Sequence, residues 1–326
     1  MPVKPGPWRR ALVAAGALLL AATACSGSDD GAPDDAAAAT ISAEVASFDL
    51  AAGRGERFIL GFFAGDNRVL AYGNVTLRFA YAGTREAPQQ EAMAGAPVEA
   101  SYLPVAGQDI DPDKPSPRLV APSEARGVYG ATGVRFDRPG FWAVVAAGTA
   151  DGEPFELDAA FEVKAAPQVV AAGEPAPRTE NPVAGAPGVD PVAIDSRADD
   201  GEIPDPELHS TTVAGALAGG RPVVVVVSTP VFCVSRFCGP ITESVQELAQ
   251  EFGDRVDFVH LEVWQDFENQ VVNPAAAEWI SPRDGGDLRE PWVFVAGADG
   301  SVTERFDNAV TDTDLRRAVE AVAASV

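Results

Sequence analysis

The fold of the second half of this chain is decided by residues 223 to 240, which read Val-Val-Val-Val-Val-Ser-Thr-Pro-Val-Phe-Cys-Val-Ser-Arg-Phe-Cys-Gly-Pro. Five consecutive valines predict a strand that is buried on both faces. Pro240 has the fixed φ that suits a first helical turn, and apolar residues then recur at helical spacing until Gly253. The sequence therefore places Cys233 and Cys238 in a short loop between a buried strand and a helix.

Helix and strand patterns alternate on both sides of this loop, from residue 207 to residue 326. The predicted elements are a helix ending at Leu217, the valine strand, a helix to Gly253, a strand over 256–263, a helix opened by Asn273 and Pro274, a hairpin of 291–296 with 301–306, and a closing helix over 311–322. Such alternation is typical of a parallel or mixed sheet covered by helices.

The order of these elements resembles the thioredoxin fold across nearly all of residues 207–326. The cysteine loop stands where that family keeps its redox motif, and Pro291, directly before a strand, matches the family's cis-proline. The resemblance implies thiol-disulfide exchange without a cofactor, acting on exported protein thiols or disulfides together with an unidentified redox partner. It also implies that Pro291 lies opposite the cysteines and presents backbone to the bound substrate.

The cysteine spacing departs from the thioredoxin pattern and is nearer to that of Sco-like and peroxiredoxin-like proteins, because four residues separate the pair instead of two. If residues 237–240 match the family's aromatic-Cys-Gly-Pro, Cys238 attacks and Ile241 replaces the second cysteine. If the motif is instead aligned by counting residues back from Phe252, at the end of the helix, Cys238 falls at the resolving position and Cys233 attacks. We prefer the second register because it retains both cysteines. The valine strand also lacks the family's buried acid, so proton handling must differ.

The chemistry needs a thiolate, and the start of a helix favours one. Unpaired backbone N–H groups and the macrodipole at a helix N-terminus lower the pKa of a cysteine there. Cys238 has this position, Gly239 and Pro240 support the helix start, and Arg236 would stabilise the thiolate further. The alternative is an inert disulfide that pins the loop to the helix, as is common in exported proteins.

Two other functions use the same residues. Two thiolates and a histidine suit Cu(I), and the Sco-like resemblance makes copper delivery an alternative. Histidine placement disfavours this function and any metal site, since we interpret His260 as a satisfied buried imidazole in a strand and His209 as solvated. The other alternative is a redox-inactive binding module that uses the Pro291 edge to hold a partner.

Residues 1–25 are predicted to be a lipoprotein signal peptide. Basic residues precede an apolar run over 11–22 that suits a secretion signal. The run ends in Ala22-Thr23-Ala24-Cys25, which resembles a lipobox with alanine where leucine is more usual. An ordinary secretion signal and an uncleaved anchor are the alternatives. The resemblance implies lipidation of Cys25 on the extracytoplasmic face of a bacterial cell membrane, and leaves one cysteine pair for a disulfide.

Two segments are predicted to lack a core. Residues 26–40 are acidic and alanine-rich and predict a disordered tether. Residues 165–206 are dense in proline and glycine and predict an extended linker between two domains.

Residues 41–164 predict an all-β domain, because short strand-like runs with period two are separated by turn residues. Residues 127–148 predict a hairpin around Arg138-Pro139-Gly140, and Trp142 is a candidate core aromatic. The stretch 129–144 is similar to the late strands of immunoglobulin-like bacterial domains, which implies a sandwich that acts as a spacer or docks a partner. The predicted fold is thus an immunoglobulin-like sandwich followed by a thioredoxin-like α/β domain.

Composition limits the remaining function classes. The 326 residues are 46% hydrophobic, which is enough for two cores. The formal net charge of −24 disfavours binding to nucleic acid or to anionic lipid headgroups, so contact with the membrane is expected through the lipid anchor alone. Three cysteines and two histidines are too few for a zinc ribbon.

Overall fold

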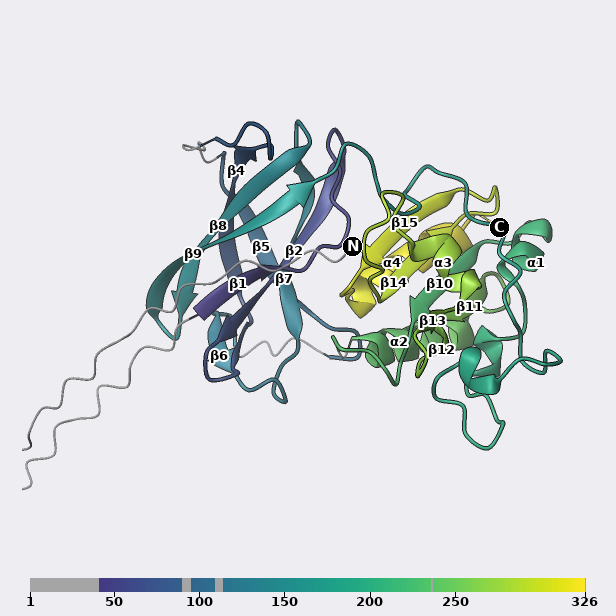
Figure 1. The fold of residues 1–326 in the computed structure, drawn as a ribbon. Coiled ribbons are helices and arrows are strands. Elements are labelled where there is room, and N and C mark those ends of the chain that lie inside the picture. The colour runs from purple at the N-terminus through teal and green to yellow at the C-terminus, as the bar shows by residue number, and fades with distance from the viewer. Residues whose placement is uncertain (1–40, 90–94, 109–113, 236, 326) are drawn as a thin grey trace, which may run out of the picture. The chain divides into compact units, whose positions relative to one another are not determined.

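Strands dominate the part of the chain that the structure describes, with 38% of its residues in strands and 17% in helices. The structure, a computed structural model, describes residues 41–89, 95–108, 114–235 and 237–325 (Figure 1). The predicted signal peptide, the tether and Cys25 lie outside these ranges. No helix within them has the length and hydropathy that a membrane crossing requires.

The first half of the described chain forms a large antiparallel sheet, compatible with the predicted β-sandwich. Its hydrogen-bonded order is β6-β3-β2-β7-β5-β4-β8-β9, and β1 pairs with β2. The strands are β1 (Ile41–Val45), β2 (Gly55–Ala64), β3 (Val69–Ala71), β4 (Asn74–Gly83), β5 (Val98–Pro104), β6 (Arg118–Val120), β7 (Gly127–Arg135), β8 (Gly140–Ala150) and β9 (Glu153–Val163).

Aromatic side chains fill the core of this sheet. Trp142 is buried, as predicted, and its ring centroid lies 5.1 Å from that of Phe136 in an edge-to-face contact. Phe58 makes the same kind of contact with Phe79 at 4.8 Å. Edge-to-face packing of this kind adds to the stabilisation that burial of the ring area provides.

The hairpin predicted over residues 127–148 is wrong. β7 pairs with β2 and β5, whereas β8 pairs with β4 and β9. In a two-layer β fold a turn can carry the chain between layers, so that consecutive strands pack against each other instead of pairing. The hairpin is instead formed by β8 and β9, joined through Asp151 and Gly152, whose positive φ values of 53° and 88° suit a tight two-residue turn.

The second half of the chain contains a four-stranded mixed sheet with the order β11-β10-β14-β15. β10 (Val223–Ser228) and β11 (Asp257–Glu262) are parallel, and β14 (Trp292–Ala296) and β15 (Val302–Asp307) are antiparallel to their neighbours. The remaining elements are the helices α1 (Val213–Ala218), α2 (Cys238–Phe252), α3 (Pro274–Ile280) and α4 (Asp312–Ala323), the 3-10 turns η1 (Pro191–Ala193) and η2 (Pro206–Leu208), and the short strands β12 (Trp264–Asp266) and β13 (Val271–Val272).

The valine strand is buried on both faces, as predicted, since all five valines have no exposed surface. Val224 and Val226 pack with apolar residues of α2 and α4, and the other three valines pack with residues of α1 and α3. The sheet is therefore covered on both sides (Figure 1). The helix after the cysteine loop is also confirmed, and it ends at Phe252 with Gly253 as its C-cap.

The segment 165–206 is packed, although its composition predicted an extended linker. Val169, Val170 and Ala176 are buried in the core beneath β14, and the backbone N–H of Ala176 donates to the carbonyl of Gly300 at 2.9 Å. The Asn181 side chain accepts from the backbone N–H of Val213 at 2.9 Å. Proline removes backbone donors, so side-chain acceptors and a few backbone bonds suffice to satisfy a buried segment without regular secondary structure.

Two buried ion pairs join the first half of the chain to β15. The Asp49 carboxylate lies 2.7 Å from Arg305 Nη1, and the Asp307 carboxylate lies 3.6 Å from Arg57 Nη1 and also accepts from the backbone N–H of Phe48 at 2.6 Å. Burial raises the pKa of Asp307, while nearby Arg57 opposes that shift. Partners of this kind are needed because an unpaired buried carboxylate is costly.

Substitution of Thr179 by valine tests whether the packed segment contributes to stability. The Thr179 hydroxyl accepts from Trp279 Nε1 at 2.9 Å and donates to Glu278 at 2.6 Å. Thr179→Val leaves the buried indole N–H without a partner, so we expect the free energy of unfolding in urea to fall by about 1–3 kcal/mol. Thr149→Val, at an exposed position in β8, is the control and should change it little. Equal free energies of unfolding for Thr179→Val and Thr149→Val would contradict the packing of this segment.

Candidate functional site

The cysteine loop connects the end of β10 to the start of α2 and is closed by a disulfide. Cys233 and Cys238 are bonded, with their Cα atoms 6.1 Å apart. Cys238 is the first residue of α2 and has no exposed surface, whereas Cys233 lies in the loop and is half-buried. The pair therefore joins an accessible sulfur to a buried one.

In the part of the chain that the structure describes, the start of α2 has neither a side-chain N-cap nor an acid in its first turn. Phe237 occupies the N-cap position without a side-chain hydrogen bond, and the first turn carries no acidic residue. The Thr242 hydroxyl donates to the carbonyl of Cys238 at 2.8 Å, one turn along the helix. The positive end of the helix dipole thus lies at Cys238, and the nearby Ser235 hydroxyl accepts from the backbone N–H of Phe237 at 3.4 Å and lies 3.2 Å from Cys233 Sγ.

Pro291 lies at the same end of the sheet as the cysteine loop. Trp292 pairs with Val227, so Pro291 is level with the last residue of β10, from which the loop departs. The Glu290–Pro291 peptide bond is cis, the conformation that the resemblance implied. Burial, reinforced by the charge of Glu262, raises the pKa of Glu290.

The supporting residues are only partly described. Gly239 and Pro240 lie in the first turn of α2 and are half-buried. Arg236, predicted to stabilise the thiolate, lies outside the described residues.

Apolar side chains border the cysteine loop. The rings of Phe232 and Phe267 stack with their centroids 4.0 Å apart, and Trp264 contacts Phe267 edge-on at 5.7 Å. These three rings line a cavity of about 380 Å³, and Val234 in the loop is 94% exposed. Asp190, Asp266 and Glu268 also line this cavity, so the surface beside the loop combines aromatic rings with carboxylates.

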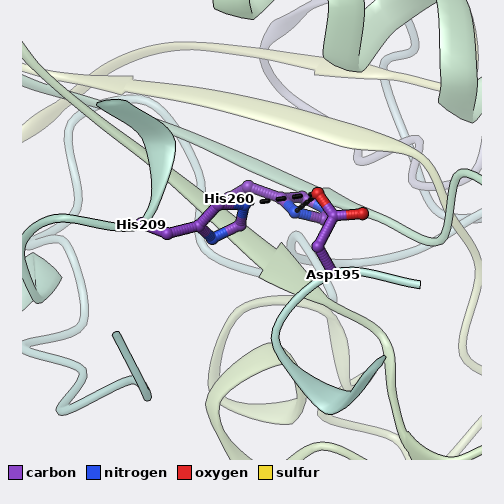
Figure 2. Close-up of side chains that lie close together, drawn as sticks. All are labelled: Asp195, His209 and His260. Atoms are coloured by element: carbon purple, nitrogen blue, oxygen red, sulfur yellow. Dashed lines mark hydrogen bonds and ion pairs between the residues drawn. The ribbon is translucent and has the colours of Figure 1, made fainter. Parts of the chain in front are cut away.

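A second group of polar side chains lies fully buried along β11 and was not predicted. Figure 2 shows the Asp195 carboxylate directed at the rings of His209 and His260. Asp195 Oδ2 is 3.2 Å from His209 Nε2 and 3.4 Å from His260 Nδ1. All three side chains have no exposed surface, and the Nδ1 atoms of both rings lack a hydrogen-bond partner. We call Asp195, His209 and His260 the buried cluster.

Arg197 holds the carboxylate of the cluster in place. Its Nε atom donates to Asp195 Oδ1 at 3.0 Å and its Nη2 atom to Oδ2 at 2.7 Å. Burial favours the neutral acid, but the adjacent His209, His260 and Arg197 side chains outweigh it and hold the pKa of Asp195 well below its usual range. Burial lowers the pKa of His209, and the bond to Asp195 offsets this shift only in part. The cluster therefore contains an ionised carboxylate.

The buried cluster is connected to the cysteine helix through Ser228. His260 Nε2 lies 3.1 Å from the Ser228 carbonyl oxygen, and the Ser228 hydroxyl lies 2.7 Å from that of Thr242. Because Thr242 donates to Cys238, these bonds run from β11 through the end of β10 to the first turn of α2. The end of β10 is thus held from both sides.

The prediction that His209 is solvated is wrong, since this side chain is 1% exposed. His260 is buried, as predicted. The burial of Asp195 was not predicted, because this residue lies in the proline-rich segment, where a carboxylate is ordinarily solvated. The weak signal that was available is the run Val192-Ala193-Ile194, three apolar residues directly before the acid.

Neither a protein-family description nor a curated protein sequence matches this chain.

The difference in burial between the two sulfurs predicts unequal reactivity after reduction. In the reduced, folded full chain, we expect iodoacetamide to modify Cys233 at least about tenfold faster than Cys238, because attack requires both thiolate and access. Timed quenching and mass spectrometry of the peptides that carry each cysteine measure both rates, with urea-unfolded chain as the control in which the rates converge. Faster modification of Cys238 would contradict the described burial.

Proposed function

We propose that this protein is a lipid-anchored thiol-disulfide oxidoreductase of the thioredoxin type, acting on exported protein thiols or disulfides. The observation that carries this proposal is the bond between Cys233, which is accessible, and Cys238, which is buried at an uncapped helix start. An accessible sulfur paired with a shielded one is what sequential attack and resolution require.

The arrangement of the mixed sheet supports a thioredoxin-like fold. The parallel unit of β10, α2 and β11 carries the cysteines at its first strand-to-helix connection. β14 runs antiparallel beside β10, which brings Pro291 to the same end of the sheet. In the proposed assignment, Pro291 presents the neighbouring backbone to the substrate strand. We assign the antiparallel sheet an immunoglobulin-like spacer or docking role, with Cys25 as the lipid anchor on the extracytoplasmic face.

The exposures favour Cys233 as the nucleophile. Its thiolate attacks one sulfur of a substrate disulfide, forms a mixed disulfide, and releases the other substrate sulfur as a thiolate. The Cys238 thiolate then attacks Cys233, which re-forms the Cys233–Cys238 bond and releases the second substrate thiolate. The substrate gains two electrons and the cysteine pair loses two, to be restored by a dithiol redox partner. The reverse sequence oxidises a substrate dithiol.

Copper delivery has less support from the geometry. A Cu(I) site at the cysteine pair needs a histidine beside the loop. Both histidines of this sequence instead face Asp195, and the cysteine sulfurs are bonded to each other.

The reduction potential of the cysteine pair tests the proposal. The full chain is equilibrated in thiol-disulfide buffers, alkylated and analysed by mass spectrometry, following only the peptides that carry Cys233 and Cys238. We expect a midpoint within the range of roughly −120 to −270 mV that exchange proteins cover. The same titration in urea is the control, since unfolding removes the effect of the helix.

A bond that resists reduction below about −300 mV would contradict the proposal. The disulfide would then be a structural link, and the mixed sheet would be better described as a redox-inactive binding module.

A further inference from the structure

We propose that Asp195, His209 and His260 form a binding site for one divalent transition metal ion, separate from the cysteine pair. The ligand atoms are Asp195 Oδ2, His209 Nε2 and His260 Nδ1, which all lie within 4.8 Å of one another. They come from three places in the chain: the segment before η2, the residue that follows η2, and β11. Figure 2 shows the three side chains converging.

The spacing of these atoms fits a tetrahedral ion. Bonds of about 2.0–2.2 Å from zinc to nitrogen and oxygen place neighbouring ligand atoms about 3.3–3.6 Å apart. The two measured separations from Asp195 Oδ2 are 3.2 Å and 3.4 Å. Small side-chain movements would therefore complete the coordination.

The hydrogen bonding of His260 leaves the required nitrogen free. Its Nε2 atom lies 3.1 Å from the Ser228 carbonyl oxygen, which can only accept, so Nε2 carries a proton. In the neutral ring, Nδ1 then presents a lone pair to a carboxylate, and this nitrogen is buried without a hydrogen-bond partner. Either a second proton on Nδ1 or a metal ion between the two acceptors resolves this conflict, and the zinc titration described below distinguishes the two. Histidines that bind metals commonly donate their other N–H to a backbone carbonyl.

The charges around the cluster also call for a cation. Arg197 Nη2 is shared by Asp195 and Asp205, at 2.7 Å from each carboxylate. Glu262, which is 1% exposed, adds a third carboxyl group and accepts from the backbone N–H of Ser196 at 2.9 Å. Arg197 is thus shared between two carboxylates, while burial raises the pKa of Glu262, and a divalent ion at Asp195 would add positive charge beside the shared guanidinium.

The donor set selects the class of ion. Two imidazoles and one carboxylate suit zinc and neighbouring transition metals, whereas calcium and magnesium prefer oxygen ligands throughout. Asp195 lies in the packed segment and His209 follows it, whereas His260 lies in β11 at the edge of the sheet. The ion would therefore link the packed segment to that edge. Metal binding would then contribute directly to folding stability.

The test uses the full chain with Cys25→Ser, Cys233→Ser and Cys238→Ser, which removes all three cysteines of the sequence, so that thiolates cannot bind the metal. After treatment with a chelator, Zn²⁺ is added, and bound metal is counted by mass spectrometry after gel filtration. We expect one equivalent of zinc, a higher melting temperature, and a Co²⁺ absorption spectrum of a tetrahedral site without a thiolate charge-transfer band. All three measurements are made on a protein in which Asp195, His209 and His260 are intact.

Variants assign the ligands. Asp195→Asn and His209→Gln should each weaken zinc binding by about a hundredfold or more, since loss of a ligand exceeds the effect of losing an outer-shell partner. Asp199→Asn, at an exposed acid of the same segment, is the matched control and should bind as the parent does. Circular dichroism without metal establishes which variants fold.

Two results would overturn the proposal. One is a folded parent that binds none of Zn²⁺, Co²⁺ and Ni²⁺ at micromolar concentration. The other is unchanged affinity in a folded Asp195→Asn or His209→Gln variant, which would place the metal elsewhere.

Discussion

A carboxylate that is fully removed from water must be paired, and in this protein that constraint falls on Asp195. Its partners are Arg197 in the same segment and two histidines that the sequence places 14 and 65 residues later. The proline-rich chain before His209 therefore has to follow the edge of β11. Once it lies there, Leu208 completes the core under α2, and Asn181 and Thr179 satisfy backbone and indole donors of α1 and α3.

The same network reaches the cysteine loop through one residue. Ser228 is the last residue of β10, its carbonyl faces His260, and its hydroxyl bonds to Thr242 in α2. The strand end, the helix start and the packed segment are thus held relative to one another around the loop that carries Cys233. A rigid frame with an accessible sulfur on a short loop is the arrangement that the proposed exchange chemistry needs. The proposed metal ion would strengthen this frame without entering the redox step.

Local patterns predicted much of the mixed sheet. Five consecutive valines predict a strand that is buried on both faces. Pro240 and Gly253 mark the start and the end of the helix that follows. Two expectations failed because they depend on distant partners. The turn at Pro139 and Gly140 shows that the chain reverses, yet it does not determine which strands β7 and β8 pair with. The composition of residues 165–206 shows few backbone donors, yet it does not reveal that Asp195 and Asn181 meet buried partners.

Amide hydrogen exchange of the full chain tests whether the proline-rich segment is an integral part of the folded mixed sheet. The decisive amides are those of Ala176, Ser196 and Val213, which donate to Gly300, Glu262 and Asn181. We predict protection comparable to that of β11, because these bonds open only when the packed segment leaves the sheet. Exchange at the rate of an unstructured peptide would contradict the account.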